Sequence, residues 1–311
     1  MSDQLPPVDI PALRPRLERA FDFACQQVRA IVERTPDYFP MYTVGGVWKH
    51  SGELWTNWCE GFLPGMMWLF YRRTGEPWWR QKAEHYCRLI EPRKHDRTVH
   101  DLGFLFLPTW RRWYELSGER RCREVVIEAG RTLARRFQRG GYICSFVGPA
   151  SLFIDIMMNV EIIFWAARET GDDELAQIAL QHCRTTRQYL VRDDGSTAHE
   201  GLFDVESGRF LRQSTHQGLH AGSCWSRGLA WALYGFGTVH RYAPEEGFLQ
   251  TACRCADYYL AHAPDDLVPC WDFDAPPEEP PLLDSSAAAI AAGGLLQLAD
   301  LLADEQAAGR Y

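Results

Sequence analysis

The chain has 311 residues, of which 46% are hydrophobic and 24% are charged, a composition typical of a soluble globular protein with a large core. Its formal net charge is −8 and it holds no basic cluster, which argues against a nucleic-acid partner. We expect no membrane-spanning helix, because no run of about 18 apolar residues occurs. The first thirty residues lack the basic and apolar regions of a secretory signal.

The ten cysteines are scattered, and several lie within apolar helical patterns. This usage predicts free thiols in a reducing compartment, so we expect a cytoplasmic protein. Cys253 and Cys255 lack a second pair or a nearby histidine at zinc-finger spacing, and no HExxH motif occurs. The sequence therefore predicts neither a metal site nor a cofactor. No linker rich in proline, glycine or serine divides the chain, and we expect one domain over residues 1–311.

Helices are predicted for most of the length. An amphipathic helix at 11–33 precedes an irregular stretch at 35–57. The remaining apolar periodicity falls into pairs: 60–73 with 77–89, 101–116 with 120–138, 155–169 with 173–191, and 224–241 with 245–262. A further apolar helix begins at Asp284. In each pair the first helix is apolar all round and the second is amphipathic, as an inner ring wrapped by an outer ring requires.

Three turns between paired helices share one signature, a threonine or serine, then Gly75, Gly118 or Gly171, then an acidic residue. Glycine ends a helix in the left-handed conformation, and the acid favours the N-terminus of the next helix. Hairpins repeated at about 50 residues indicate a repeat architecture. We therefore predict an all-α fold, an (α/α)6-type toroid of helix hairpins whose long loops converge at one mouth.

The longest of these loops, 194–223, contains a strand-like alternation. Leu202 and Phe203 stand opposite Phe210 and Leu211 across a turn. The pattern predicts an ordered β-hairpin.

Two aspartates begin inner helices. Asp155 lies between Ile154 and Ile156, and Asp101 begins an aromatic helix. Paired carboxylates serve general acid/base catalysis at glycosidic centres. Capping of the helix N-terminus is the alternative interpretation of either residue, and the two roles are compatible.

Other polar and aromatic residues cluster near the predicted mouth. His100, His199 and His216 are candidates for acid/base groups, ligands or ordinary surface residues. Tryptophans in or next to the loops suit the apolar faces of sugar rings, or simply fill a helical core: Trp48, Trp55, Trp58, Trp225, Trp231 and Trp271. Arg227 needs a carboxylate partner, from the protein or from a ligand. The residues alone thus indicate a toroid acting on a carbohydrate.

Five motifs in order, HDLGF, IDIMMN, STHQG, CWSRGLAWALYGF and WDF…DSSAAAIAAGGLL, resemble those of the unsaturated glucuronyl hydrolases of glycoside hydrolase family 88. The resemblance covers about residues 55–298 and implies an (α/α)6 barrel. It also implies hydrolysis of sugars that carry a 4,5-unsaturated uronic acid at the non-reducing end. The implied reaction hydrates the C4=C5 enol ether, and the product hemiketal opens to release the next sugar.

The resemblance also implies roles for single residues. Asp155 would protonate C4 and activate water, while Asp101 with His100 would bind ring hydroxyls and hold the geometry of the site. Substrate-binding positions are implied for Trp55, His100, His199, Gln217, Trp225, Arg227 and Trp231. Because Asp155 must donate a proton near neutral pH, we expect its apolar neighbours to raise its pKa.

The sequence departs from the family pattern in three places. Leu219-His220-Ala221-Gly222 replaces an acidic pair, and Phe146 stands where a tryptophan is common. We count about five helix pairs where the family has six, so the barrel is open, a partner chain such as a second copy closes it, or the sequence is truncated. Two alternatives follow: an unsaturated rhamnogalacturonyl hydrolase, or a carbohydrate-binding toroid without activity.

Overall fold

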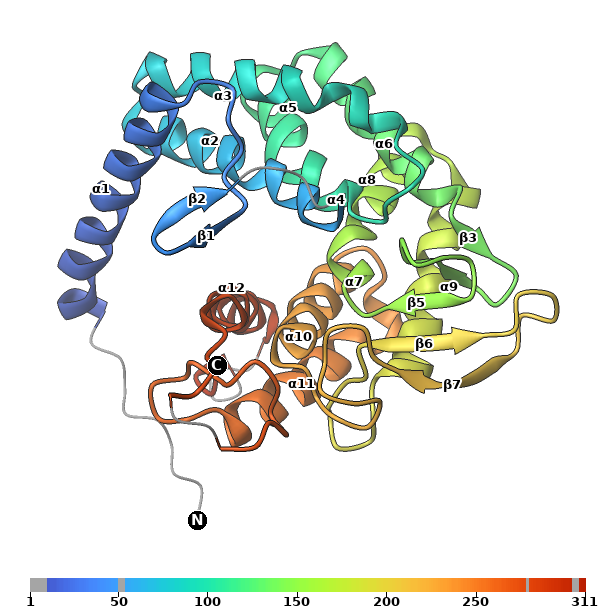
Figure 1. Ribbon diagram of the computed structural model, residues 1–311. Helices are drawn as coiled ribbons and strands as arrows, with labels where there is room; N and C mark the ends of the chain where they lie inside the picture. Colours follow the sequence, from blue (N-terminus) through green and yellow to red (C-terminus); the bar gives the residue numbers. More distant parts are fainter. Residues whose placement is uncertain (1–9, 50–53, 278–279, 304–307) are drawn as a thin grey trace. The chain divides into compact units, whose positions relative to one another are not determined.

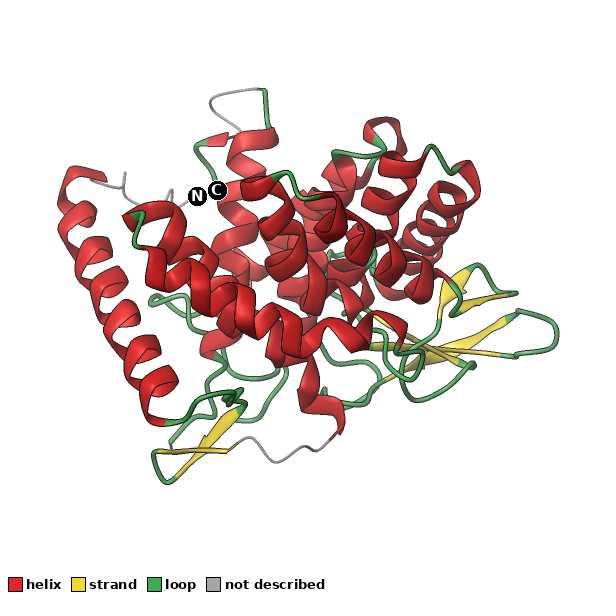
Figure 2. Ribbon diagram, turned by 90° about the horizontal axis from the view of Figure 1, so that it is seen from above, coloured by secondary structure: helices red, strands yellow, loops and turns green. Residues whose placement is uncertain are grey.

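The computed structural model describes residues 10–49, 54–277, 280–303 and 308–311 (Figure 1). Helices dominate these residues and the strands are short (Figure 2). The chain divides into two compact units, one from Met1–Asp96 and Phe104–Ala129, the other from Arg97–Gly103 and Gly130–Tyr311. One domain over residues 1–311 stays a prediction. Within the described ranges, every helix is too short or too polar to cross a membrane.

The first unit carries the N-terminal helices. Its elements are α1 (Ile10–Arg34), β1 (Tyr42–Val44), β2 (Val47–Lys49), η1 (Leu54–Gly61), α2 (Phe62–Thr74), α3 (Pro77–Ile90), η2 (Glu91–His95), the π-helical turn η3 (Leu107–Arg111) and α5 (Arg112–Ser117). Two more helices, α4 (Leu102–Phe106) and α6 (Arg120–Ala134), contribute residues to both units.

The α2–α3 hairpin confirms the predicted turn chemistry. Gly75 has φ 69°, and its N–H donates to the carbonyl of Tyr71 at 2.8 Å, which ends α2. The buried core of the hairpin is organised around Cys87. Trp68 Nε1–H donates to its Sγ at 3.3 Å, and Trp110 Nε1–H donates to its carbonyl at 2.9 Å. Both indole donors therefore have a partner inside the core, as buried tryptophans require.

Two expectations for the first unit are wrong in detail. The stretch at 35–57 contains a hairpin of β1 and β2, turned by Gly45 and Gly46 at φ 58° and 77°, a geometry that favours paired glycines. The predicted helix at 101–116 is interrupted by η3, which begins next to Pro108. Proline lacks the N–H that a regular helical turn would use there, so the hydrogen-bond ladder is interrupted at this point.

The second unit carries the remaining elements. They are β3 (Phe137–Gln138), β4 (Tyr142–Ile143), β5 (Ser151–Phe153), α7 (Ile156–Asn159), α8 (Glu161–Thr170), α9 (Asp173–Leu190), β6 (Glu200–Phe203), β7 (Phe210–Ser214), α10 (Ser226–His240), η4 (Pro244–Glu246), α11 (Phe248–His262) and α12 (Ser285–Leu301).

Burial separates inner from outer helices in this unit. In α10, 11 of 15 residues are buried, whereas in α9 only 7 of 18 are. Helix α10 packs against both α11 and α12 (Figure 1). The pairing of apolar α10 with amphipathic α11 is the arrangement that the sequence predicts.

Two predicted helices of this unit end or break early. The helix at 120–138 ends at Ala134, because Phe137 and Gln138 pair with β4 as strand β3. The helix at 155–169 is divided into α7 and α8 at Val160.

An antiparallel sheet in the order β5–β6–β7 lies beside these helices. The predicted hairpin is confirmed: Phe203 pairs with Phe210. An irregularity between Leu202 and Phe203 shifts the register, so Leu202 pairs with Arg212. The sequence did not reveal β5, whose Phe153 pairs with Glu200. This added strand brings Asp155, two residues beyond it, close to His199 at the start of β6.

Candidate active site

Most of the predicted site residues lie in the second unit. His100 and Asp101 precede α4, Asp155 lies between β5 and α7, and His199 precedes β6. Gln217 follows β7. Trp225, Arg227 and Trp231 lie at the start of α10 or within it. Trp55 lies in η1 of the first unit, and its side chain is outside the described residues.

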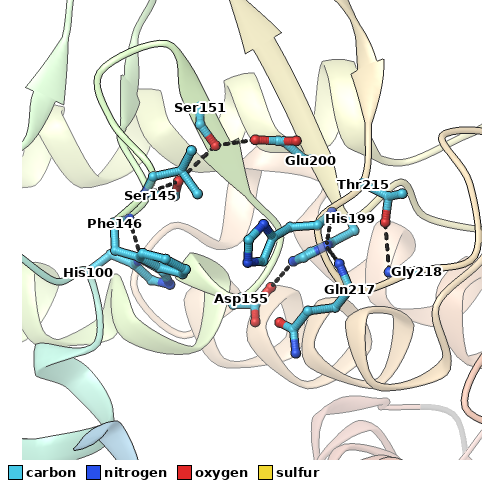
Figure 3. Close-up of polar contacts among 12 residues, drawn as sticks. His100, Ser145, Phe146, Ser151, Asp155, His199, Glu200, Thr215, Gln217 and Gly218 are labelled. Atoms are coloured by element: carbon cyan, nitrogen blue, oxygen red, sulfur yellow. Dashed lines mark hydrogen bonds and ion pairs between the residues drawn. The ribbon is translucent and has the colours of Figure 1, made fainter. Parts of the chain in front are cut away.

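His199 faces Asp155. Nε2 of the imidazole lies 3.4 Å from Asp155 Oδ2, and both atoms are buried, with no other hydrogen-bond partner among the described residues (Figure 3). The other ring nitrogen, Nδ1, accepts the backbone N–H groups of His216 at 3.0 Å and Gln217 at 2.9 Å. A nitrogen that accepts two N–H groups cannot carry a proton, so the neutral ring is protonated at Nε2. His199 therefore directs its N–H at Asp155.

His100 repeats this arrangement with Asp101. Its Nδ1 accepts the N–H of Phe146 at 3.1 Å, and its Nε2 lies 3.3 Å from Asp101 Oδ1. The Phe146 ring stacks on the imidazole with centroids 5.8 Å apart. Burial lowers the pKa of His100 to about 3, although the charge of Asp155 opposes this shift. The ring is therefore neutral at physiological pH, with its N–H directed at Asp101.

The expectation that enclosure raises the pKa of Asp155 is wrong. Burial does favour the neutral acid, but the N–H contact with His199, the electrostatic effect of the His100 imidazole and the charge of Arg227 outweigh burial and lower the pKa. The side chain makes no capping bond to α7, so capping does not account for this residue. Asp155 is a largely buried carboxylate, 13% exposed, that faces an imidazole N–H.

Asp284 supplies the carboxylate that Arg227 needs. It lies 2.7 Å from Arg227 Nη1 and caps α12 by accepting the N–H of Ala287 at 2.9 Å. The guanidinium also lies over the Trp225 ring, 4.7 Å from its centroid. Capping and ion pairing thus coexist at Asp284, and Arg227 is fixed beside an aromatic face.

The remaining predicted residues differ in how closely they join this cluster. The Trp225 ring lies 4.7 Å from the His199 ring, and the Gln217 side chain lies beside the Asp155 carboxylate in Figure 3. Trp231 is buried within α10. His216 is exposed and lies edge-on to Phe146 at 5.5 Å.

Sequence patterns missed three side chains that support the site, Ser145, Ser151 and Glu200. Glu200 is the first residue of β6 and directly follows His199, and in extended backbone neighbouring side chains face opposite sides. The sequence signal for Glu200 was its position, directly after a candidate histidine in a segment where polar and apolar residues alternate. Within the described ranges, no group of three or more His, Cys, Asp or Glu side chains could hold a metal ion.

Gly103 allows close contact between the two helix starts that carry the aspartates. A Cβ at this position would lie 2.5 Å from Cα and 2.7 Å from O of Asn159, at the end of α7. We expect Gly103→Ala to destabilise the protein by about 1–3 kcal/mol and to lower kcat/KM more than tenfold, because backbone must move between Asp101 and Asp155.

Thermal unfolding and steady-state kinetics test this expectation. Gly237→Ala is the matched control, because its Cβ would meet Gln297 and Leu298 at ordinary distances of 3.4 to 3.6 Å. Equal behaviour of the two variants would show that the Gly103 contact does not set the geometry of the site.

The sequence of this chain matches those of known proteins. A sequence model described as Glycosyl Hydrolase Family 88 matches residues 30–298. An unsaturated glucuronyl hydrolase of Bacillus sp. (strain GL1) is 36% identical over 257 residues, which are 79% of this chain and 68% of the relative. An unsaturated chondroitin disaccharide hydrolase of Streptococcus pneumoniae is 32% identical over 70% of this chain and 57% of its own length.

Solved structures agree with the sequence matches. The crystal structure of an unsaturated glucuronyl hydrolase from Streptococcus agalactiae superposes with a TM-score of 0.87 at 28% identity, covering 94% of this chain and 76% of that one. The crystal structure of an unsaturated glucuronyl hydrolase specific for heparin also superposes with a TM-score of 0.87. It is 29% identical, and the match covers 93% of this chain and 80% of that one. The fold is thus that of an all-α glycoside hydrolase of the (α/α)6-barrel type, as predicted. The chain belongs to glycosyl hydrolase family 88.

Proposed function

We propose that this protein removes a 4,5-unsaturated uronic acid from the non-reducing end of oligosaccharides made by polysaccharide lyases, by hydrating the C4=C5 enol ether. The observation that carries this proposal is Asp155, a buried carboxylate that meets a fixed imidazole N–H and lies near a second His–Asp pair. The resemblance to unsaturated glucuronyl and chondroitin disaccharide hydrolases supports the substrate class.

In the proposed reaction Asp155 acts twice. Its protonated form gives a proton to C4, and the carboxylate that results takes a proton from the water that adds to C5. The hemiketal at C5 then opens and the C–O bond to the leaving sugar is released. Atoms balance, because one water is consumed and Asp155 returns to its protonated form.

The lowered pKa of Asp155 in the ligand-free site is compatible with this role. A bound uronate brings a second negative charge and displaces water, and both effects favour the protonated form of a carboxyl group. Asp155 would then take up a proton as substrate binds. His199 cannot be the general base at Nε2, because that nitrogen already carries its proton. Its role is to orient Asp155.

The other residues bind the substrate. Asp101 and His100 meet ring hydroxyls, and Trp225 and Trp231 offer aromatic surface to the sugar. Arg227, held by Asp284, supplies positive charge for the uronate. Trp55 and Gln217 complete the proposed binding set. We further propose a cytoplasmic location, which the ten free thiols support.

Loss of the ultraviolet absorbance of the C4=C5 bond tests the proposed function. The protein is incubated with unsaturated disaccharides from chondroitin, hyaluronan, heparin, gellan, ulvan and pectin lyases. We expect the absorbance to fall with at least one unsaturated glucuronyl disaccharide. Loss only with the pectin-derived product would favour the rhamnogalacturonyl alternative. Binding of a disaccharide without any loss would favour the inactive carbohydrate-binding alternative.

A further inference from the structure

Glu200 is a buried acid that the proposed reaction does not use. It follows His199 in the chain but faces the opposite side of β6, and the residue is 6% exposed. Among the described residues, no cationic side chain forms an ion pair with it. A buried carboxylate is costly unless it accepts hydrogen bonds, so its partners indicate why it is there.

Glu200 is the end of a chain of hydroxyl groups. Ser151 Oγ donates to Glu200 Oε1 at 2.5 Å, and Ser145 Oγ donates to Ser151 Oγ at 2.7 Å (Figure 3). A carboxylate only accepts, so both hydroxyl protons must point toward Glu200. This direction leaves a lone pair of Ser145 Oγ for the N–H of Val147, which donates to it at 3.2 Å.

The bond to Val147 shapes the turn that holds His100. The turn is also tied to β5, since the N–H of Ser145 donates to the Ser151 carbonyl at 2.7 Å and that of Ser151 to the Gly148 carbonyl at 3.1 Å. Phe146, inside this turn, directs its N–H at His100 Nδ1. Four hydrogen bonds and one turn thus connect Glu200 with the imidazole that faces Asp101.

We propose that Glu200 is a positioning residue for the second His–Asp pair, acting through Ser151 and Ser145 on the turn that fixes the Nε2–H tautomer of His100. The carboxylate sets the direction of both hydroxyl groups, and the directed hydroxyls hold the Phe146 N–H on Nδ1. The inference extends the proposed function, because it gives a role to a residue that does not contact the substrate.

The groups that face His100 explain what loosening the turn would do. They are Asp101 beside it, Asp155 before α7, His199 before β6 and Arg136 after α6. Burial, Arg136 and His199 disfavour the charged imidazole, whereas the carboxylate of Asp155 favours it. Releasing Nδ1 from the Phe146 N–H frees that nitrogen to take a proton, and the carboxylate of Asp155 then stabilises the imidazolium.

Two substitutions interrupt the chain at different points. Ser151→Ala removes the link to the carboxylate. Glu200→Gln keeps the shape but adds an amide that can donate to Ser151, which removes the fixed direction. We expect kcat/KM to fall about tenfold in both variants. The acid limb of the kcat–pH profile should move toward the ordinary histidine pKa, about 6.5.

Histidine ¹⁵N NMR tests the same inference without substrate, with His100→Gln used for assignment. The wild-type His100 ring should show the neutral Nε2–H pattern from pH 5 to pH 8, and in both variants it should titrate within that range. This result does not depend on turnover, so failure of the proposed function and failure of the positioning role are distinguishable.

Thr251→Val is the control, because it removes a buried hydroxyl whose bond, to the Gly247 carbonyl at 3.2 Å, lies on α11 outside this chain of hydroxyls. It should lose stability while keeping the kinetics and the His100 spectrum. If Ser151→Ala and Glu200→Gln behave like this control, Glu200 has only a structural role and the proposal is overturned.

Discussion

Asp155→Asn is expected to lower kcat at least about 10³-fold while the protein keeps its helical content and unfolds near the wild-type temperature. General acid/base groups contribute about 10²–10⁴-fold, and here one carboxyl group would serve both proton transfers. The amide has nearly the same volume and can turn its oxygen toward the His199 N–H, so the packing around it persists. Asparagine cannot give a proton to C4, which removes the first step of the reaction.

The measurement combines the absorbance assay with circular dichroism and thermal unfolding. Asp194→Asn is the matched control, because Asp194 is also a hydrogen-bonded loop aspartate but accepts from Ser196 and lies outside the two His–Asp pairs. Its activity should stay within about twofold of wild type. A rate near wild type for Asp155→Asn would remove Asp155 from the proposed chemistry.

The second large effect concerns stability in mild acid. Burial lowers the pKa of His100 and of His182 to about 3. Between pH 6.5 and pH 3 the unfolded chain therefore binds more protons than the native protein, and stability falls as pH falls. From neutral pH to pH 5, each histidine should cost about 2 kcal/mol, or about 4 kcal/mol together.

The carboxylates affect stability in a different, lower range of pH. The lowered pKa of Asp155 gives stability that is present above its unfolded value and lost only as pH falls further, below about 4. Urea unfolding at pH 7 and pH 5 thus isolates the histidine effect. His182→Asn keeps a carbonyl acceptor for the Ile143 N–H, which now donates to Nδ1 at 3.1 Å, and it should remove about half of the difference. Equal stability at the two pH values in the wild-type protein would contradict the assignment of these buried neutral rings.

Local patterns predicted the helices and their turns well, because the signals are local. Gly75 ends α2 through a bond to Tyr71, four residues earlier, and such chemistry is visible in the sequence. The early end of α6 was not predictable, since it depends on strand pairing between Phe137 and Ile143. Candidate residues such as Asp155 and His199 were recognisable, but their contact depends on the pairing of β5 with β6, which no local pattern encodes.

The pKa of Asp155 shows where sequence reasoning fails most clearly. Its neighbours in the chain are apolar and suggest a raised value. The groups that decide the direction are His199 and Arg227, which are 44 and 72 positions away in the sequence. Electrostatic environment is a property of the folded molecule, so an apolar local sequence cannot give its sign.

The alternation of β6 has a consequence for how this protein can change over evolutionary time. His199 directly precedes β6 and Glu200 begins it, with their side chains on opposite sides of the chain, so inserting or deleting a single residue there would exchange the two sides. At the tip of the hairpin, Gly208 turns the chain at φ 74° and is packed against the backbone of Arg139 and Gly140, whereas Val205 is exposed. Length variation is therefore better tolerated at the exposed residues 205–207, while the start of β6 must keep its register for both His–Asp pairs to survive.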